Sequence, residues 1–266
     1  RYVALRMLSW SISSTLAIPT PTSATSCRAP KSDSRRLADS FLVSFSPFGA
    51  VAGSMIAAPA TTGPAHGPRP ASSTPQTGRS AQALGLDYDS AFKKGNYPGL
   101  LSTRPLQTEM LNRSVSKAIG QPVIAAKGTS HGHCRLSLSG DKGRSGVHID
   151  PCFYSGILYL SLPEHCRGGT DFFRHRRTGL EGIPRTPTDL IKSGYSDPNV
   201  LIEDVINKDT TRPAKWERTM RVPMRFNRLI LFSPLMFHNA GPAFGTKPDN
   251  GRLVSLLFFM PGQAAG

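Results

Sequence analysis

The feature of this sequence that most constrains its fold is a series of short apolar stretches with a two-residue period, all in its second half. They are HCRLSLS (133–139), SGILYLSL (155–162), TDFFRH (170–175), RLILFSPL (228–235) and RLVSLLFFM (252–260). Residues i and i+2 of a strand point to the same face, and Gly, Pro or Asp bounds each stretch. Many short strands of this kind predict an antiparallel sandwich or barrel.

Helical patterns are fewer. PLQTEMLNRSVSKAIG (105–120) has apolar residues at helical spacing and ends in Gly120, a C-cap signal. The polar interruption 176–226 is expected to hold one helix, because Ser196-Asp197-Pro198 forms a cap before NVLIEDVIN. This insertion is placed where a lid or substrate-binding loop would be expected, since loops on a rigid scaffold tend to carry specificity. A disordered excursion is the alternative.

Residues 1–85 differ in composition from the remainder. They are rich in Ser, Pro, Ala and Thr, and contain eight basic residues against two acidic ones, Asp33 and Asp39. We predict a disordered, low-complexity N-terminal segment, because such a composition cannot bury enough apolar surface to offset the entropy of ordering. An organelle-targeting leader or an imperfectly defined chain start (the first residue is Arg1) are the alternatives. The ordered domain is expected to span 86–266.

The formal charge of +15 and the four cysteines limit which partners and which cellular compartment can be expected. The cysteines show no CxxC pair and no regular spacing, so a disulfide framework is not expected and a reducing, intracellular compartment is predicted for what should be a soluble protein. The most apolar stretch, 42–58, is short and interrupted, so no membrane partner is expected. The basic run 174–177 and the arginines of 218–228 could draw in an anionic substrate or lie along a nucleic acid. Nucleic acid is not the expected partner, because no recognition module accompanies them.

The motif GVHID (146–150) places His148 and Asp150 on one strand face. Alone, H-x-D favours a polar sheet edge, but His238 follows 88 residues after Asp150 at the end of an apolar strand, and Arg252 opens the next strand. Two histidines and one carboxylate form a facial triad that leaves three coordination positions open, which suits non-heme Fe(II) that must bind a co-substrate and O2. A buried Arg252 would need an anion, and its fork matches a carboxylate.

These motifs in this order (H-x-D, YL-x-L with GGTDFF, then RLILF…H…R) resemble the Fe(II)/2-oxoglutarate-dependent oxygenases, in the prolyl-hydroxylase-like branch. The resemblance covers roughly residues 86–262. It implies a mainly β fold, a double-stranded β-helix (jelly-roll, cupin-like) with supporting N-terminal helices. It also implies that His148, Asp150 and His238 hold the catalytic iron, and that Arg252 and Tyr159 bind the distal carboxylate of 2-oxoglutarate.

Two positions depart from the family pattern. The loop between His238 and Arg252 has 13 residues and is longer than usual. The family's Arg-x-Ser pairing is absent, because position 254 is Val and Ser255 should face the other way in a strand.

The expected function is that of a dioxygenase with Fe(II), 2-oxoglutarate and O2, hydroxylating an amino acid, a peptidyl residue or a small metabolite. Two alternatives stay open: a nucleic-acid demethylase of the same chemistry, and a non-catalytic β-barrel that binds a metal or a small anion. His165 and His175 are expected in solvated loops, and the scatter of His131, His133, Cys134, Cys152 and Cys166 fits no zinc pattern.

Overall fold

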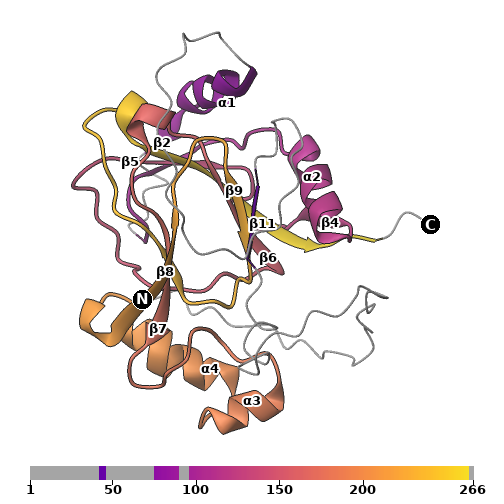
Figure 1. Ribbon diagram of the computed structural model, residues 1–266, viewed down its shortest axis with the longest axis vertical. Coiled ribbons are helices and arrows are strands. Elements are labelled where there is room, and N and C mark those ends of the chain that lie inside the picture. The colour runs from indigo at the N-terminus through magenta and orange to yellow at the C-terminus, as the bar shows by residue number, and fades with distance from the viewer. Residues whose placement is uncertain (1–41, 46–74, 90–95, 264–266) are drawn as a thin grey trace, which may run out of the picture.

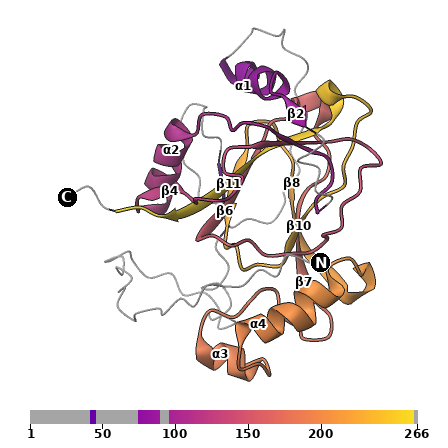
Figure 2. The ribbon, with the colours of Figure 1, turned by 180° about the vertical axis from the view of Figure 1, so that it is seen from behind.

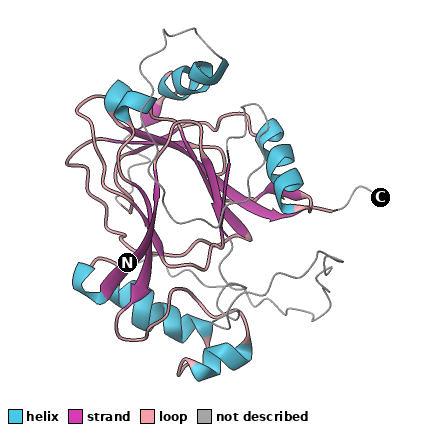
Figure 3. Ribbon diagram, viewed as in Figure 1, coloured by secondary structure: helices cyan, strands magenta, loops and turns pink. Residues whose placement is uncertain are grey.

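The computed structural model describes residues 42–45, 75–89 and 96–263 of the chain. This part of the protein is mainly β, with two antiparallel sheets at its centre and helices at its margins (Figures 1 and 3). The mainly β class predicted from the two-residue period is therefore confirmed. In the described part of the chain, no helix has the length and apolar character that crossing a bilayer requires.

The larger sheet has the strand order β1-β9-β6-β11-β5-β3-β2, and β4 pairs with the end of β11. Its strands are β1 (Leu42–Phe45), β2 (Tyr88–Asp89), β3 (Leu100–Ser102), β4 (Val123–Ala125), β5 (Cys134–Ser137), β6 (Tyr154–Tyr159), β9 (Leu229–Phe232) and β11 (Arg252–Pro261). The long strand β11 organises this sheet, because it pairs with β6 on one side and with β5 and β4 on the other.

The smaller sheet has the order β10-β7-β8. Its strands are β7 (Gly169–His175), β8 (Trp216–Pro223) and β10 (His238–Ala240). An isolated bridge between His148 and His238 adds the 146–150 segment beside β10. Gly169 is required where β7 begins, because a Cβ there would collide with the backbone carbonyl of Val222 on β8.

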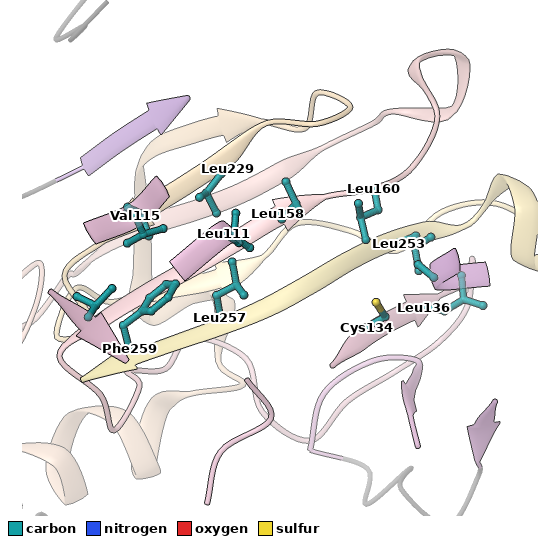
Figure 4. Packing of buried hydrophobic residues seen from close by; sticks show 13 residues of the cluster. Leu111, Val115, Cys134, Leu136, Leu158, Leu160, Leu229, Leu253, Leu257 and Phe259 are labelled. Carbon is teal, nitrogen blue, oxygen red and sulfur yellow. The ribbon is translucent and has the colours of Figure 1, made fainter. Parts of the chain in front are cut away.

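Two helices, α1 (Pro75–Leu84) and α2 (Glu109–Ile119), cover the outer face of the larger sheet (Figures 1 and 2). Helix α2 ends at Gly120, which adopts the left-handed conformation that the C-cap signal predicted. Leu111 and Val115, one turn apart on α2, bury their side chains against the sheet. Figure 4 shows this cluster, to which the strands contribute alternate residues of β5, β6, β9 and β11.

The other alternate residues of these strands point between the two sheets. A second apolar cluster fills this interior and joins residues of both sheets, among them Tyr159 and Ile230 from the larger sheet and Phe172 and Val222 from the smaller one. The interior is therefore a narrow space between two sheets, and one part of it is polar.

A third cluster covers the outer face of the smaller sheet. It brings Phe237 and Trp216 together with the helical part of the 176–226 insertion, which lies beyond β7 in Figure 1. This part comprises α3 (Pro187–Lys192), α4 (Pro198–Leu201) and a continuing π-helical turn, η3 (Ile202–Asn207). Asp197 caps α4 by accepting a hydrogen bond from the backbone of Asn199, so the predicted helix start is confirmed. Single 3-10 turns occur at η2 (Pro163–His165), η4 (Pro213–Lys215) and η5 (Pro248–Asn250).

Two predicted boundaries are wrong. Helix α1 and strand β1 both lie inside 1–85, which the composition assigned to disorder; the remainder of that segment lies outside the described residues. Ser80 of α1 donates a hydrogen bond to the carbonyl of Leu160 at 2.6 Å, which ties the helix to the sheet.

The predicted insertion 176–226 extends too far toward the C-terminus, because β8, which lies within it, is a full strand of the smaller sheet. The helical part of the insertion packs behind that sheet, and the cavity described below takes no lining residue from it, so the lid interpretation lacks structural support.

Candidate metal centre

Three side chains predicted as metal ligands meet at one point between the sheets. One ligand atom from each of His148, Asp150 and His238 lies within 4.8 Å of the other two. The Nε2 atom of His238 lies 3.2 Å from Asp150 Oδ2, and the Nε2 atom of His148 lies 3.8 Å from Asp150 Oδ1. Within the described residues, no other group of three His, Cys, Asp or Glu side chains gathers in this way.

Backbone pairing sets the position of the two histidines. His148 and His238 exchange both backbone N–H···O bonds, at 2.9 and 3.0 Å, and their rings lie 4.4 Å apart between centroids. The ring Nδ1 of His148 lies 2.9 Å from the carbonyl of Gly146, and that of His238 lies 2.8 Å from the carbonyl of Met236. Because a carbonyl only accepts, each Nδ1 carries a proton, so Nε2 is the ring nitrogen that faces Asp150 and is placed to bind a metal. This is the tautomer that a metal-binding imidazole needs.

The carboxylate is oriented by Ser155 of β6, whose hydroxyl donates to Asp150 Oδ2. Burial alone would raise the pKa of Asp150, but the charge of His238, the hydrogen bonds from His238 and Ser155, and the charge of His148 lower it to about 2. Burial, aided by the charge of His238, lowers the pKa of His148 to about 4. Near neutral pH the aspartate is therefore ionised and His148 neutral, which are the protonation states that coordinate a divalent cation.

A cavity of about 130 Å³ opens at the three ligands and extends between the sheets. Arg252, the first residue of β11, lines it and is only 2% exposed. Its Nη2 atom donates to the carbonyl of Gly169 at 3.4 Å, whereas its Nε atom is buried without a hydrogen-bond partner. A buried guanidinium with an unpaired N–H is costly unless an anion completes its bonding, so this end of the cavity fits a carboxylate.

Tyr159 is the one predicted site residue that the structure does not bring to this cavity. It is fully buried in the interior cluster, and its hydroxyl shares a hydrogen bond of 2.8 Å with Thr170. It is absent from the residues that line the cavity in the described part of the chain. Val254 does line the cavity, and the Ser255 hydroxyl instead donates to the carbonyl of Gly132, so the expected direction of these two side chains is confirmed.

Sequence reasoning missed two residues of the cavity wall. Arg135 of β5 and Tyr97, from the loop before β3, both line it. The signal for Arg135 was present, because Arg135 and Ser137 share one face of a strand whose other face is apolar. A polar strand face ordinarily means solvent, whereas here it faces the interior. Tyr97 has no comparable signal in the sequence.

The basic residues that suggested an anionic partner are mostly paired within the protein. Acidic side chains contact four of them, as shown by the pairs Arg174–Glu181, Arg177–Asp204, Arg218–Asp171 and Arg221–Asp171. The Arg221–Asp171 pair is bidentate. This internal pairing removes much of the argument for a nucleic-acid backbone at this surface.

His175 does not lie in a solvated loop. It is fully buried at the end of β7, where its Nε2 atom lies 3.1 Å from Asp209 Oδ2 and its Nδ1 atom lies 3.1 Å from the Thr178 hydroxyl. The indole of Trp216 packs on its ring and donates to the backbone carbonyl of Asp209. The prediction failed because the insertion folds back over this end of the strand.

The fold and the site together define an antiparallel β protein with a two-histidine, one-carboxylate cluster beside a buried arginine. Comparison with known families gives a second description. Residues 78–259 match the model of a family of unknown function, DUF6445, and the chain belongs to that family. No curated protein matches the chain. The match begins within α1 and ends at Phe259 in β11, so it includes every residue of the cluster and of the cavity wall.

Proposed function

We propose that this protein is an Fe(II)- and 2-oxoglutarate-dependent dioxygenase whose iron is held by His148, Asp150 and His238. The observation that carries the proposal is the convergence of three metal-ready ligand atoms on a cavity that also contains the unpaired Nε of Arg252. A mixed imidazole and carboxylate set without thiolate suits Fe(II) and leaves coordination positions free. A closed four-ligand set would instead suit structural zinc.

Strand order supports a double-stranded β-helix as the finer description of the fold. In that architecture eight strands alternate between two sheets. Here the chain from β5 onward passes to the 146–150 segment, then to β6, to β7 and β8, to β9, to β10 and to β11. The first, third, sixth and eighth of these lie in the larger sheet, in the order β9-β6-β11-β5. The other four lie on the side of the smaller sheet. The 146–150 segment pairs with β10 through the His148–His238 bridge, β10 pairs with β7, and β7 pairs with β8. The metal ligands then belong to the second and seventh strands of the helix.

The residues of the chain have separate tasks in the proposed reaction. His148, Asp150 and His238 would bind the iron on one side, and Ser155 holds the carboxylate in place. Arg252 would bind the distal carboxylate of 2-oxoglutarate and so orient its keto-acid end toward the ligands. The apolar walls at Ile157, Phe232 and Leu256 would exclude water from the reacting atoms.

Bound Fe(II) would supply O2 activation coupled to the oxidative decarboxylation of 2-oxoglutarate. In the overall balance, one oxygen atom of O2 enters a substrate C–H bond as a hydroxyl group. The other oxygen atom enters the succinate that forms as CO2 leaves. The substrate class expected from the sequence, an amino acid, peptidyl residue or small metabolite, is part of this proposal.

The test is a succinate-release assay with purified protein, Fe(II), 2-oxoglutarate and air. We expect slow turnover without added substrate and its loss in His148→Ala. His165→Ala is the matched control, because His165 is partly exposed in η2 and lies outside the cavity lining. Unchanged turnover in His148→Ala would contradict the ligand assignment. A wild-type protein that binds metal but consumes no 2-oxoglutarate would favour the non-catalytic barrel.

A further inference from the structure

The cavity contains a second guanidinium, which the proposed function does not use. Arg135 lies on β5 directly beside Val254 of β11, two residue pairs away from the Ser137–Arg252 pair and so on the same face of the sheet. Both Arg135 and Arg252 line the cavity together with the three ligands. The two arginines therefore face the same interior space from neighbouring strands.

Arg135 has no acidic partner among the described residues. Its Nη1 atom donates to the backbone carbonyl of Pro98 at 3.4 Å, and its guanidinium lies 5.4 Å from the ring centroid of Tyr97. By contrast, Arg174, Arg177 and Arg221 each pair with a carboxylate although they lie on the surface. A long N···O contact and an aromatic ring do not replace a counter-ion for a charge withdrawn from water.

The two arginines lie at different depths. Arg252 is buried in the cavity wall, whereas Arg135 is partly exposed. Tyr97 connects Arg135 to the ligands, because its ring contacts the guanidinium and also packs edge-on against His148, with ring centroids 4.8 Å apart. Arg135 is thus the more exposed of the two guanidiniums, and Tyr97 places it near the ligand His148.

The charge of the cavity requires a further anion once the proposed function is granted. Asp150 is the only acidic side chain that lines the cavity in the described part of the chain. With a divalent metal and both guanidiniums present, the site carries three positive charges in excess. Doubly charged 2-oxoglutarate neutralises two of them and leaves one, which belongs to Arg135. Uncompensated charge inside a low-dielectric cavity attracts a counter-ion strongly.

We propose that Arg135 binds a carboxylate of the substrate to be oxidised, so that this enzyme acts on a small carboxylic acid. Arg135 is then a specificity-determining residue that holds the substrate next to the metal ligands, with Tyr97 keeping the guanidinium in place. This inference rests on the proposed function for the identity of the reaction. The placement of an anion at Arg135 can be tested without turnover.

The experiment measures the binding of propionate to protein loaded with Zn(II), which has no redox chemistry, and saturated with 2-oxoglutarate. Propionamide is the uncharged control ligand. We expect propionate to bind and propionamide not to bind, and Arg135→Gln to weaken propionate about tenfold or more, as expected for loss of a charge-assisted hydrogen bond. The affinity for 2-oxoglutarate should stay within about twofold, because Arg252 is intact.

Two further variants give the controls. Arg104→Gln removes one exposed charge outside the cavity and should leave propionate binding unchanged. Arg135→Lys keeps the charge but loses the planar fork, so it should weaken propionate by less than Arg135→Gln does. This variant also decides the question if Arg135→Gln does not fold.

Two results would overturn the inference: propionate binding that is equal in wild type and Arg135→Gln, or a loss of 2-oxoglutarate affinity in Arg135→Gln as large as the loss for propionate. The second result would assign Arg135 to the co-substrate. If wild-type Zn(II) protein fails to bind 2-oxoglutarate, the proposed function fails instead. In that case propionate is titrated into the Zn(II) protein without 2-oxoglutarate. Its affinity for Arg135→Gln is compared with its affinity for Arg252→Lys, which still tests Arg135.

Discussion

Two histidine–aspartate clusters lie on opposite faces of the smaller sheet, and they differ in how many imidazoles share the carboxylate and in whether a cavity adjoins them. At His175 both nitrogens are used within the protein, one by Thr178 and the other by Asp209. At His148 and His238 each Nδ1 is used by a backbone carbonyl, and each Nε2 points to the shared carboxylate and the cavity. Proximity of His and Asp thus does not distinguish a metal site from a structural pair. Two imidazole Nε2 atoms and one carboxylate that meet beside a cavity do.

Removal of a ligand should give the largest difference between the clusters. We expect His238→Ala to weaken metal binding on the order of a thousandfold, because structural zinc sites gain roughly 10–16 kcal/mol from about four ligands. His175→Ala should leave metal affinity unchanged. Titration with a chromophoric chelator measures both. Equal metal loss in the two variants would remove the distinction between the clusters.

The second largest effect should be a loss of folding stability when the His175–Asp209 cluster is disrupted. Asp209→Ala leaves the Nε2 atom of the buried His175 without its carboxylate partner, so we expect the free energy of unfolding to fall by about 3 kcal/mol. Urea denaturation of metal-free protein measures this. Metal stoichiometry in the folded variant should equal that of wild type, and a decrease would show that the clusters are coupled.

Bound metal should stabilise the folded protein only through the cluster of His148, Asp150 and His238. At a free metal concentration one hundred times its dissociation constant, the free energy of unfolding should rise by about 2.7 kcal/mol in wild type and in Asp209→Ala alike. Asp150→Ala should show no such rise, because it lacks the carboxylate that bridges the two imidazoles. Thermal unfolding with and without Zn(II) checks the prediction, and metal-linked stabilisation that persists in Asp150→Ala would refute it.

The last comparison concerns pH in metal-free protein, where the effect is spread over more than two pH units. The pKa of His148 is about 4 in the folded protein, below its ordinary value of 6.5, so between these values the unfolded chain binds more protons than the folded one. Stability should therefore fall as the pH is lowered from about 6.5 to 4, by at most about 1.4 kcal/mol per pH unit. The decline should be shallower in His148→Gln. Identical pH profiles for the two proteins would contradict the role of burial.

The sequence predicted those parts of the molecule that a local period reveals. The strands β5, β6, β7, β9 and β11 and the helix α2 follow from alternation or helical spacing with clear end signals. The edge strand β8 was missed because it is largely polar and partly exposed. Helix α1 was missed because it packs through small side chains, Ser80 and Ala83, in a segment whose composition resembles disorder.

The site was predicted to the extent that its residues carry a motif. The three ligands and Arg252 come from H-x-D, a strand-ending histidine and a strand-opening arginine, and the structure brings all four to one cavity. Tyr159 was assigned by family likeness alone, and Thr170 on β7 of the facing sheet provides a partner for its hydroxyl that no local pattern shows. Arg135 was overlooked because only tertiary structure tells whether a polar strand face meets water or a cavity.

The reciprocal hydrogen bonds between His148 and His238 have a consequence for how this protein can diversify. These two backbone hydrogen bonds set the separation of the two residues that carry the imidazoles, and side chains do not take part in them. Arg135 and Tyr97, by contrast, belong to a different sheet and to a separate loop. Substitutions at Arg135 or Tyr97 therefore leave the backbone pairing that spaces the two imidazoles unchanged.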